Sequence, residues 1–248
     1  MPRTVRKGSK TGIYHIMFRG INKQCIFQDD EDRSIFLNRL QRFKYESDFE
    51  LYAYCLMSNH VHLLIKETSE PISSIIKRIG VSYVYWFNKK YERTGHLFQD
   101  RYKSEPIEND SYLLAAARYI HQNPMQVGLT IDSWTSYSDY YRNSGITDKL
   151  FILDLFNKNR MLALDLFAKY MNEKNSDKCL ELFDRKIISD KEAEAIVKKL
   201  GNVMFCQDIQ KLDKIERDKI LCKIKCEGIS IRQLARLTGL NRGVILNA

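Results

Sequence analysis

The chain has 248 residues, of which 44% are hydrophobic, a proportion typical of a folded protein with one large domain or two smaller ones. No apolar run approaches the roughly 20 residues that cross a bilayer, which argues against a membrane protein. The 40 Lys and Arg residues exceed the 31 Asp and Glu residues, and this basic excess favours a polyanionic partner, with nucleic acid the first to consider.

The N-terminal segment MPRTVRKGSKTGIYH is basic but lacks the apolar stretch and the small-residue cleavage site of a secretory signal. We therefore expect a cytoplasmic, nucleoid-associated protein. The cysteines form no C-x-x-C pair, so they predict reduced thiols in place of a disulfide or zinc scaffold. They are Cys25, Cys55, Cys179, Cys206, Cys222 and Cys226.

The first half alternates between strand and helix patterns. Strands are predicted at residues 12–20, 49–57, 60–65 and 96–104, and helices at residues 30–46, from Pro71 to Phe87, and from an Asn109 cap to about Gln122. Ser58 and Asn59 form the tight turn of a hairpin. This order predicts an α+β fold of the ferredoxin-like or RRM-like kind, an antiparallel sheet with helices on one face and the other face free for a ligand.

The second half changes in composition, because 13 of the 14 tyrosines and both tryptophans precede residue 150. We predict a catalytic domain at residues 1–145 and an all-α region at residues 146–248 that ends in a helix-turn-helix at about residues 208–248. The expected helices lie near residues 149–157, 160–172, 176–185, 189–200 and 208–226.

The helix-turn-helix prediction depends on spacing near the C-terminus. Ala235 allows two helices to cross closely, Gly239 takes the turn, and the β-branched Ile245 anchors the second helix. Ser230 and Asn241 are the expected N-caps. The pattern favours DNA binding over two ordinary packing helices, although few residues remain for a recognition helix before the chain reaches Ala248.

Two histidines one residue apart, His60 and His62, stand in the apolar run YCLMSNHVHLLI. Side chains alternate across a strand, so both imidazoles lie on one face and predict part of a divalent metal site that needs a further ligand. The alternative is a pair of histidines that hydrogen-bond within the sheet. A zinc hydrolase of the H-x-H-x-D-H type is disfavoured, because Leu63, Leu64 and Ile65 follow.

The third predicted helix offers the missing groups. Tyr119 and Asn123 are four residues apart and share one helical face, which supplies a nucleophile and a neutral oxygen ligand. Arg118 and His121 beside them are either phosphate contacts or ordinary solvent-facing residues. Tyr112, seven residues before Tyr119, lies on roughly the same face.

Taken together, the segments Asn59-His60-Val61-His62, Gly95-His96-Leu97-Phe98-Gln99-Asp100-Arg101-Tyr102 and Ala117-Arg118-Tyr119-Ile120-His121-Gln122-Asn123-Pro124 resemble the single-tyrosine HUH transposases, most closely the REP-associated tyrosine transposases with an IS200-like domain. The resemblance covers roughly residues 8–142. The end of the chain resembles the helix-turn-helix of replication-initiator DNA-binding domains.

The resemblance implies that Tyr119 attacks a phosphate of single-stranded, hairpin-associated DNA to form a 5′-phosphotyrosine link, which a second strand's 3′-hydroxyl later reseals. It also implies a Mg²⁺ or Mn²⁺ ion held by His60, His62 and Asn123. Many relatives carry glutamine where Asn123 stands, and asparagine is typical of the REP-associated branch.

The expected partners are a single-stranded DNA hairpin, duplex DNA through the C-terminal region, and at most a second copy of the chain. A catalytically inactive DNA-binding regulator and a metal-dependent hydrolase unrelated to DNA are the alternatives. The side chains expected to contact DNA are Arg19, Arg101, Arg118, His121, Arg236 and Arg242.

Overall fold

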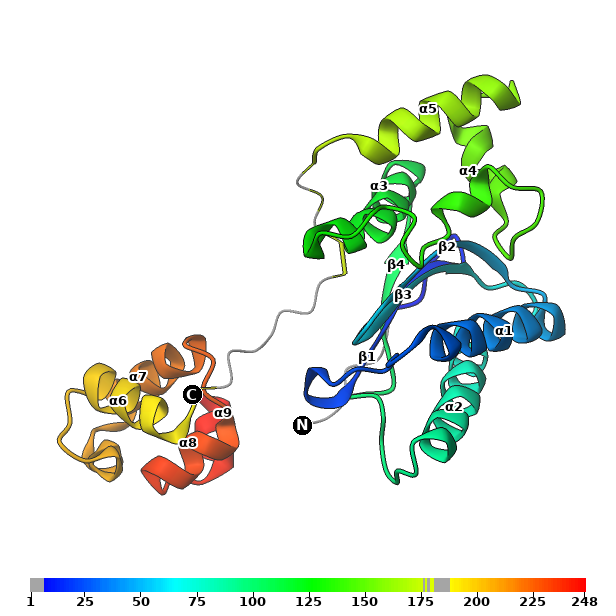
Figure 1. Cartoon of the computed structure of the whole chain (residues 1–248). Coiled ribbons are helices and arrows are strands. Elements are labelled where there is room, and N and C mark those ends of the chain that lie inside the picture. Colours follow the sequence, from blue (N-terminus) through cyan, green and yellow to red (C-terminus); the bar gives the residue numbers. More distant parts are fainter. Residues whose placement is uncertain (1–6, 176, 178, 181–187) are drawn as a thin grey trace. The chain divides into compact units, whose positions relative to one another are not determined.

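The computed structural model describes residues 7–175, 177, 179–180 and 188–248, shown in Figure 1. The described residues form two compact units, the first reaching residue 180 and the second beginning at residue 188. The helix expected at residues 176–185 falls mostly outside the described residues. The division of the chain into a catalytic domain and a DNA-binding region at residue 145 stays a prediction.

The first unit is built on a four-stranded sheet in the order β2-β3-β1-β4, in which every neighbouring pair is antiparallel. This arrangement confirms the predicted α+β class with a split βαβ topology. The strands are β1 Ile13–Arg19, β2 Glu50–Met57, β3 His60–Lys66 and β4 Lys103–Ile107.

The fourth strand begins later than the sequence predicted. Residues 96–102 are irregular and only Phe98 forms an isolated bridge, to Gly20, so the predicted span 96–104 is wrong at its start. Backbone hydrogen bonds still run from Ile21 to Leu97 and from Gln99 to Arg19. The segment therefore lies along the end of β1 without forming a regular strand.

Helices cover both faces of this sheet, as Figure 1 shows. Helices α1 (Asp30–Ser47) and α2 (Ile72–Lys90) cover one face, as predicted. Helix α3 (Asp110–Gln122) packs on β2 and β3 from the other side, with α4 (Lys149–Phe156) and α5 (Arg160–Asn172) beyond it. The second face is therefore not left open as expected. No helix in the described part of the chain is long and apolar enough to span a membrane.

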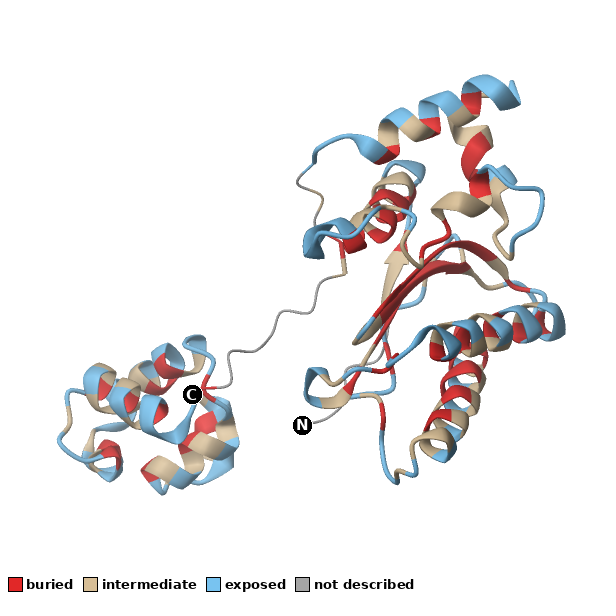
Figure 2. Ribbon diagram, viewed as in Figure 1, coloured by how far each residue is buried: buried red, intermediate tan, exposed pale blue. Residues whose placement is uncertain are grey.

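The buried sides of the helices follow from local sequence. Helix α1 begins with a capping box between Asp29 and Asp32, and Asn109 caps α3 by accepting from the backbone N–H of Tyr112. Ala116 and Ala117 are fully buried against the sheet, and their small side chains let α3 approach it closely. In Figure 2 the buried positions of α3 face the strands.

The second unit is wholly helical where it is described. Its elements are α6 Asp190–Gly201, the 3₁₀ helix η4 Cys206–Lys211, α7 Lys214–Cys226, α8 Ile231–Thr238 and α9 Arg242–Asn247. The helix predicted at residues 208–226 is thus two elements, because Asp213 caps a new helix by accepting from the N–H groups of Ile215 and Glu216.

The last two helices agree with the predicted spacing. Ser230 and Asn241 are both N-caps, Gly239 has a φ of 72°, and Ile245 is fully buried. Helix α9 has only six residues. DNA binding by this pair of helices remains a prediction. The short second helix limits how many bases it would reach.

Gly20 sits where β1 ends and the chain turns into the 3₁₀ helix η1 (Ile21–Lys23). It is buried, its N–H bonds to the carbonyl of Asn59, and a Cβ atom there would overlap the backbone oxygen of Gln24. The absence of a side chain at this position therefore lets the turn close beside the strand that carries the two histidines.

We expect Gly20→Ala to lower the free energy of unfolding by about 1–3 kcal/mol, because the backbone near Gln24 must move to admit the methyl group. Urea unfolding followed by circular dichroism measures the change. Gly8→Ala is the matched control, since nothing lies within 4 Å of a Cβ at Gly8. Equal stability of the two variants would contradict the steric argument.

Candidate active site

The hairpin of β2 and β3 places His60 and His62 on the face of the sheet that α3 covers. His60 pairs with Met57 and Arg19 in the flanking strands, and His62 pairs with Cys55 and Met17. The two imidazole rings are perpendicular, with their centroids 5.0 Å apart. His62 is only 2% exposed and His60 is partly exposed, so this face is open at His60 and closed at His62.

Each histidine is held through its Nδ1 atom. His60 Nδ1 lies 2.6 Å from Asn59 Oδ1, and His62 Nδ1 lies 2.9 Å from Nε2 of His15 on β1. In both rings the Nε2 atom is the one left for another partner. Metal-binding histidines are commonly held in this way, with one ring nitrogen hydrogen-bonded and the other on the ion.

Helix α3 brings the two predicted partners to the histidines. The Tyr119 ring packs edge-on against the His62 ring, with centroids 5.6 Å apart, and against the His15 ring at 6.0 Å. Asn123 keeps helical backbone angles at the C-cap of α3, and its Oδ1 lies 3.1 Å from His60 Nε2. The four residues His60, His62, Tyr119 and Asn123 therefore form one site within a single chain.

The histidines of this site are neutral. Burial lowers the pKa of His60, the hydrogen bond to Asn123 opposes this in part, and the nearby Arg19 guanidinium adds a smaller lowering effect. Burial also holds the pKa of His62 well below the usual value, with contributions from His15 and His60. Neutral imidazoles are the form that binds metal ions.

The donor set at His60 and Asn123 fits a divalent cation. If His60 carries its proton on Nδ1, toward Asn59, its Nε2 lone pair and the Asn123 oxygen face each other. Adjacent ligands of an octahedral ion at about 2.1 Å lie about 3 Å apart, close to the 3.1 Å between these two atoms. Among the described residues no group of three or more His, Cys, Asp or Glu side chains could hold a metal.

Tyr112 does not take part in this arrangement. Burial, followed by its hydrogen bond to Glu105, raises the pKa of the Tyr112 hydroxyl. The ring contacts with His15 and His62 belong to Tyr119. The geometry therefore separates two tyrosines that helical spacing alone placed on the same side.

Residues 9–123 match the model of the family described as Transposase IS200 like. The predicted resemblance to IS200-like transposases is thereby confirmed for these residues. No curated protein matches the chain.

Two solved structures are similar to the chain. A REP-associated tyrosine transposase bound to a REP hairpin is 15% identical, with a TM-score of 0.48, over 60% of this chain and 96% of that chain. A putative transposase from Deinococcus radiodurans R1 is 18% identical, with a TM-score of 0.34, over 44% of this chain and 89% of that chain.

The candidate site has one residue that the sequence did not single out. His15 is fully buried between His62 and Tyr119, yet it lies more than 40 positions before both histidines of the motif. A histidine in an apolar strand was the only signal. Its place beside His62 depends on the β1–β3 register, which pairs His15 with Leu64 and Met17 with His62.

Two residues expected to contact DNA are placed away from solvent. The Arg118 guanidinium pairs with Asp177 at 2.9 Å and Glu173 at 3.3 Å, and it stacks over the Tyr170 ring. His121 is fully buried and bonds to the hydroxyl of Ser136. Arg118 thus ties α3 to the segment that follows α5, and neither residue is presented to a DNA phosphate.

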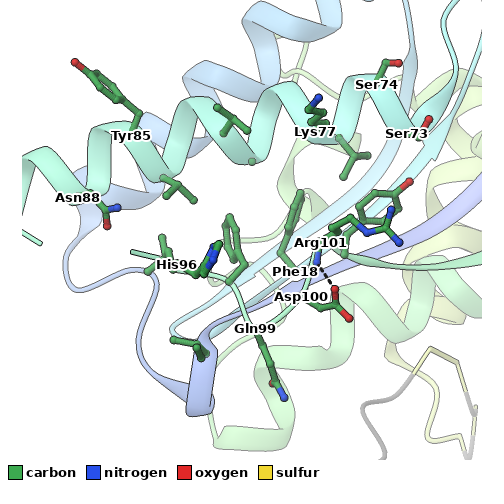
Figure 3. A pocket seen from close by; sticks show the side chains of 18 residues that line it. Phe18, Ser73, Ser74, Lys77, Tyr85, Asn88, His96, Gln99, Asp100 and Arg101 are labelled. Carbon is green, nitrogen blue, oxygen red and sulfur yellow. Dashed lines mark hydrogen bonds between the residues drawn. The ribbon is translucent and has the colours of Figure 1, made fainter. Parts of the chain in front are cut away.

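Arg101 lies on the surface of the first unit, in a groove of about 840 Å³ between α2 and residues 96–102 (Figure 3). Phe18, Phe98 and Gly80 are among the residues that form its apolar floor, and the cations of Arg101 and Lys77 stand at its edge with Asp100 as the one carboxylate. Neither cation forms an ion pair with any residue described by the structure.

The remaining expected DNA contacts are distributed over both units. Arg19 is partly exposed and pairs in register with His60, so it belongs to the edge of the site. Arg236 is exposed and forms an ion pair with Asp190, whereas Arg242 is exposed at the start of α9. Contact of these residues with DNA stays a prediction.

We expect Arg118→Met to destabilise the chain by about 1–3 kcal/mol, because the partly buried Asp177 carboxylate and the exposed Glu173 carboxylate lose their cation. Urea unfolding measures this loss. Single-stranded DNA affinity, measured on the folded variant by fluorescence anisotropy, should change less than about twofold, because the buried Arg118 side chain makes no phosphate contact. A large loss of DNA affinity with unchanged stability would show that Arg118 contacts DNA.

Proposed function

We propose that this protein cleaves and rejoins single-stranded, hairpin-associated DNA through a covalent link between Tyr119 and a 5′-phosphate. The observation that carries the proposal is the position of the Tyr119 ring against His62 while Asn123, one helical turn on, faces His60. The match of residues 9–123 to IS200-like transposases supports it. The activity would serve DNA transposition or the processing of repeats.

In the proposed reaction the Tyr119 oxygen bonds to phosphorus as the bond to the 3′ oxygen breaks. The phenol loses its proton, and the departing 3′ oxygen gains one to become a hydroxyl. Resealing reverses these changes with the 3′-hydroxyl of a second strand, so the phosphoester bond is conserved throughout and no external energy source is required. The fixed packing of the Tyr119 ring holds the nucleophile in place before DNA arrives.

His60, His62 and Asn123 would hold a Mg²⁺ or Mn²⁺ ion. When bound, such an ion polarises the phosphate oxygen and offsets its developing charge. The chain's own part is to present two neutral imidazoles and one amide oxygen on rigid elements, and to exclude water around His62. Arg19, in register with His60, is placed to contact the phosphate from the open side.

The test is covalent trapping. We expect the full chain with Mn²⁺ to form a denaturation-resistant adduct with hairpin oligonucleotides labelled on the 3′ side of the cleaved bond. A 5′-end label should instead leave with the fragment that carries the 3′-hydroxyl. Tyr119→Phe should lose the adduct by at least about 1,000-fold, since covalent catalysis loses its nucleophile. Gel electrophoresis in denaturant measures it.

Tyr112→Phe is the matched control, because it removes a hydroxyl from the same helix outside the site. Adduct formation by Tyr119→Phe would refute the assignment of the nucleophile. Retained hairpin affinity with no adduct from the wild-type chain would instead identify a DNA-binding regulator, and loss of all DNA affinity would favour a hydrolase of another substrate.

We further propose that the groove between α2 and residues 96–102 receives part of the DNA strand. Its two cations suit phosphates, and its floor suits the flat faces of bases. The groove and the site lie on opposite faces of the sheet, and the end of β1 connects them, because residues 97–99 are hydrogen-bonded to it and its Gly20 is hydrogen-bonded in turn to Asn59.

The double variant Lys77→Ala, Arg101→Ala should weaken single-stranded DNA binding and reduce the slope of log K against log salt by about 1–2, since each phosphate contact contributes about 0.7. Fluorescence anisotropy across a salt series measures both quantities. Lys89→Ala, on the exposed side of α2 and outside the groove, is the control. An unchanged salt slope in the double variant would show that the groove does not bind the DNA strand.

A further inference from the structure

His15 is a buried histidine with no part in the proposed reaction. It lies on β1, fully buried, and its Nε2 atom is 2.9 Å from Nδ1 of His62. The two rings are tilted by 41° with centroids 5.0 Å apart. The other ring nitrogen of His15, Nδ1, is buried with no hydrogen-bond partner. His15 therefore makes one side-chain hydrogen bond through its ring, and His62 receives it.

A single proton occupies the contact between the two rings, and its position decides what His62 can do. A neutral His15 carries one N–H, on either Nδ1 or Nε2. If His15 Nε2–H donates, His62 must carry its own proton on Nε2 and cannot bind a cation there. If His62 Nδ1–H donates to His15 Nε2, the Nε2 lone pair of His62 is free for a metal ion.

We propose that His15 is a positioning residue that fixes His62 as the Nδ1–H tautomer, with its Nε2 atom unprotonated and directed to the metal. The inference rests on the proposed metal site of His60, His62 and Asn123. It assigns to a residue on β1 the role that carboxylates or backbone carbonyls take beside other metal-binding histidines. His15 then holds its own proton on the buried Nδ1 atom, which has no acceptor in the described structure.

His60 offers an internal comparison, because it is held by Asn59 from its own strand turn. A neighbour in the chain can orient the partly exposed His60, whereas the buried His62 depends on another strand. His60 Nε2 faces Asn123 Oδ1 on α3, and in the proposed tautomers both rings donate from Nδ1 to an acceptor. Loss of His15 would leave the buried Nδ1–H of His62 without an acceptor and its ring free to turn.

The chain provides a matched control in His121. It is also fully buried, it also bonds through Nε2, and its Nδ1 also has no hydrogen-bond partner among the described residues. Its partner is the Ser136 hydroxyl, outside the proposed metal site. Replacing either histidine by leucine removes one buried imidazole and one hydrogen bond, but only the change at His15 touches a ligand.

The experiment is a Mn²⁺ titration of the full chain followed by electron paramagnetic resonance, with no DNA present. His15→Leu should weaken Mn²⁺ binding about 10–100-fold, the usual effect of removing a hydrogen-bond partner of a ligand histidine. His15→Gln should restore binding to within about threefold of wild type, because its amide oxygen accepts from His62 Nδ1–H. His121→Leu should leave Mn²⁺ affinity unchanged. Circular dichroism confirms that each variant is folded.

Nuclear magnetic resonance of ¹⁵N-labelled histidine in the wild-type chain tests the tautomer directly, even if His15→Leu does not fold. With Mg²⁺ bound, His62 and His15 should both show protonated Nδ1 and unprotonated Nε2. A His62 proton on Nε2 in that state overturns the inference, as does Mn²⁺ binding by folded His15→Leu as tight as that of wild type. If the wild-type chain binds no Mn²⁺, the metal site of the proposed function fails as well. Normal Mn²⁺ binding without a tyrosine adduct would leave the role of His15 intact.

Discussion

The packing of α3 across β2 and β3 is the contact on which the candidate site depends. Ala116 and Ala117 bring the helix backbone close to the strands, and this closeness puts Tyr119 against His62 and Asn123 against His60. A bulkier residue at either alanine would lift the helix and separate the nucleophile from the ligands. The packing of α3 in the core therefore also determines the geometry of the site.

The same packing removes water from part of the site. His15, His62 and Asn123 are almost fully buried, whereas His60 and Tyr119 keep some exposure. The site thus has a dry side, where imidazoles stay neutral and fixed, and a wet side near Arg19, where a DNA strand can enter. A phosphate arriving from the wet side would meet groups whose orientations are already set.

Local patterns in the sequence were sufficient for most elements and for the principal site residues. The alternation HVH, the spacing of Tyr119 and Asn123 and the Asn109 cap are short-range features, and the structure brings these histidines, tyrosine and asparagine together. Long-range properties were less accessible. The role of α3 as cover for the second face, the irregular path of residues 96–102 and the burial of Arg118 all depend on which segments meet. His15 belongs to this class, because its partner is set by strand register.

The contacts of Arg118 have a consequence for how far the working unit extends. Residues 9–123 match the family model, but Glu173 and Asp177 lie far beyond them and hold α3 at the residue next to Tyr119. Phe167 of α5 is packed in the same core as Ala116 and Ala117. Helix α3 is thus held by residues outside the matched region, and a fragment cut at residue 123 would keep the site residues but lose contacts that hold the helix in place. A chimeric protein that keeps this site should therefore include the whole first unit, up to about residue 180.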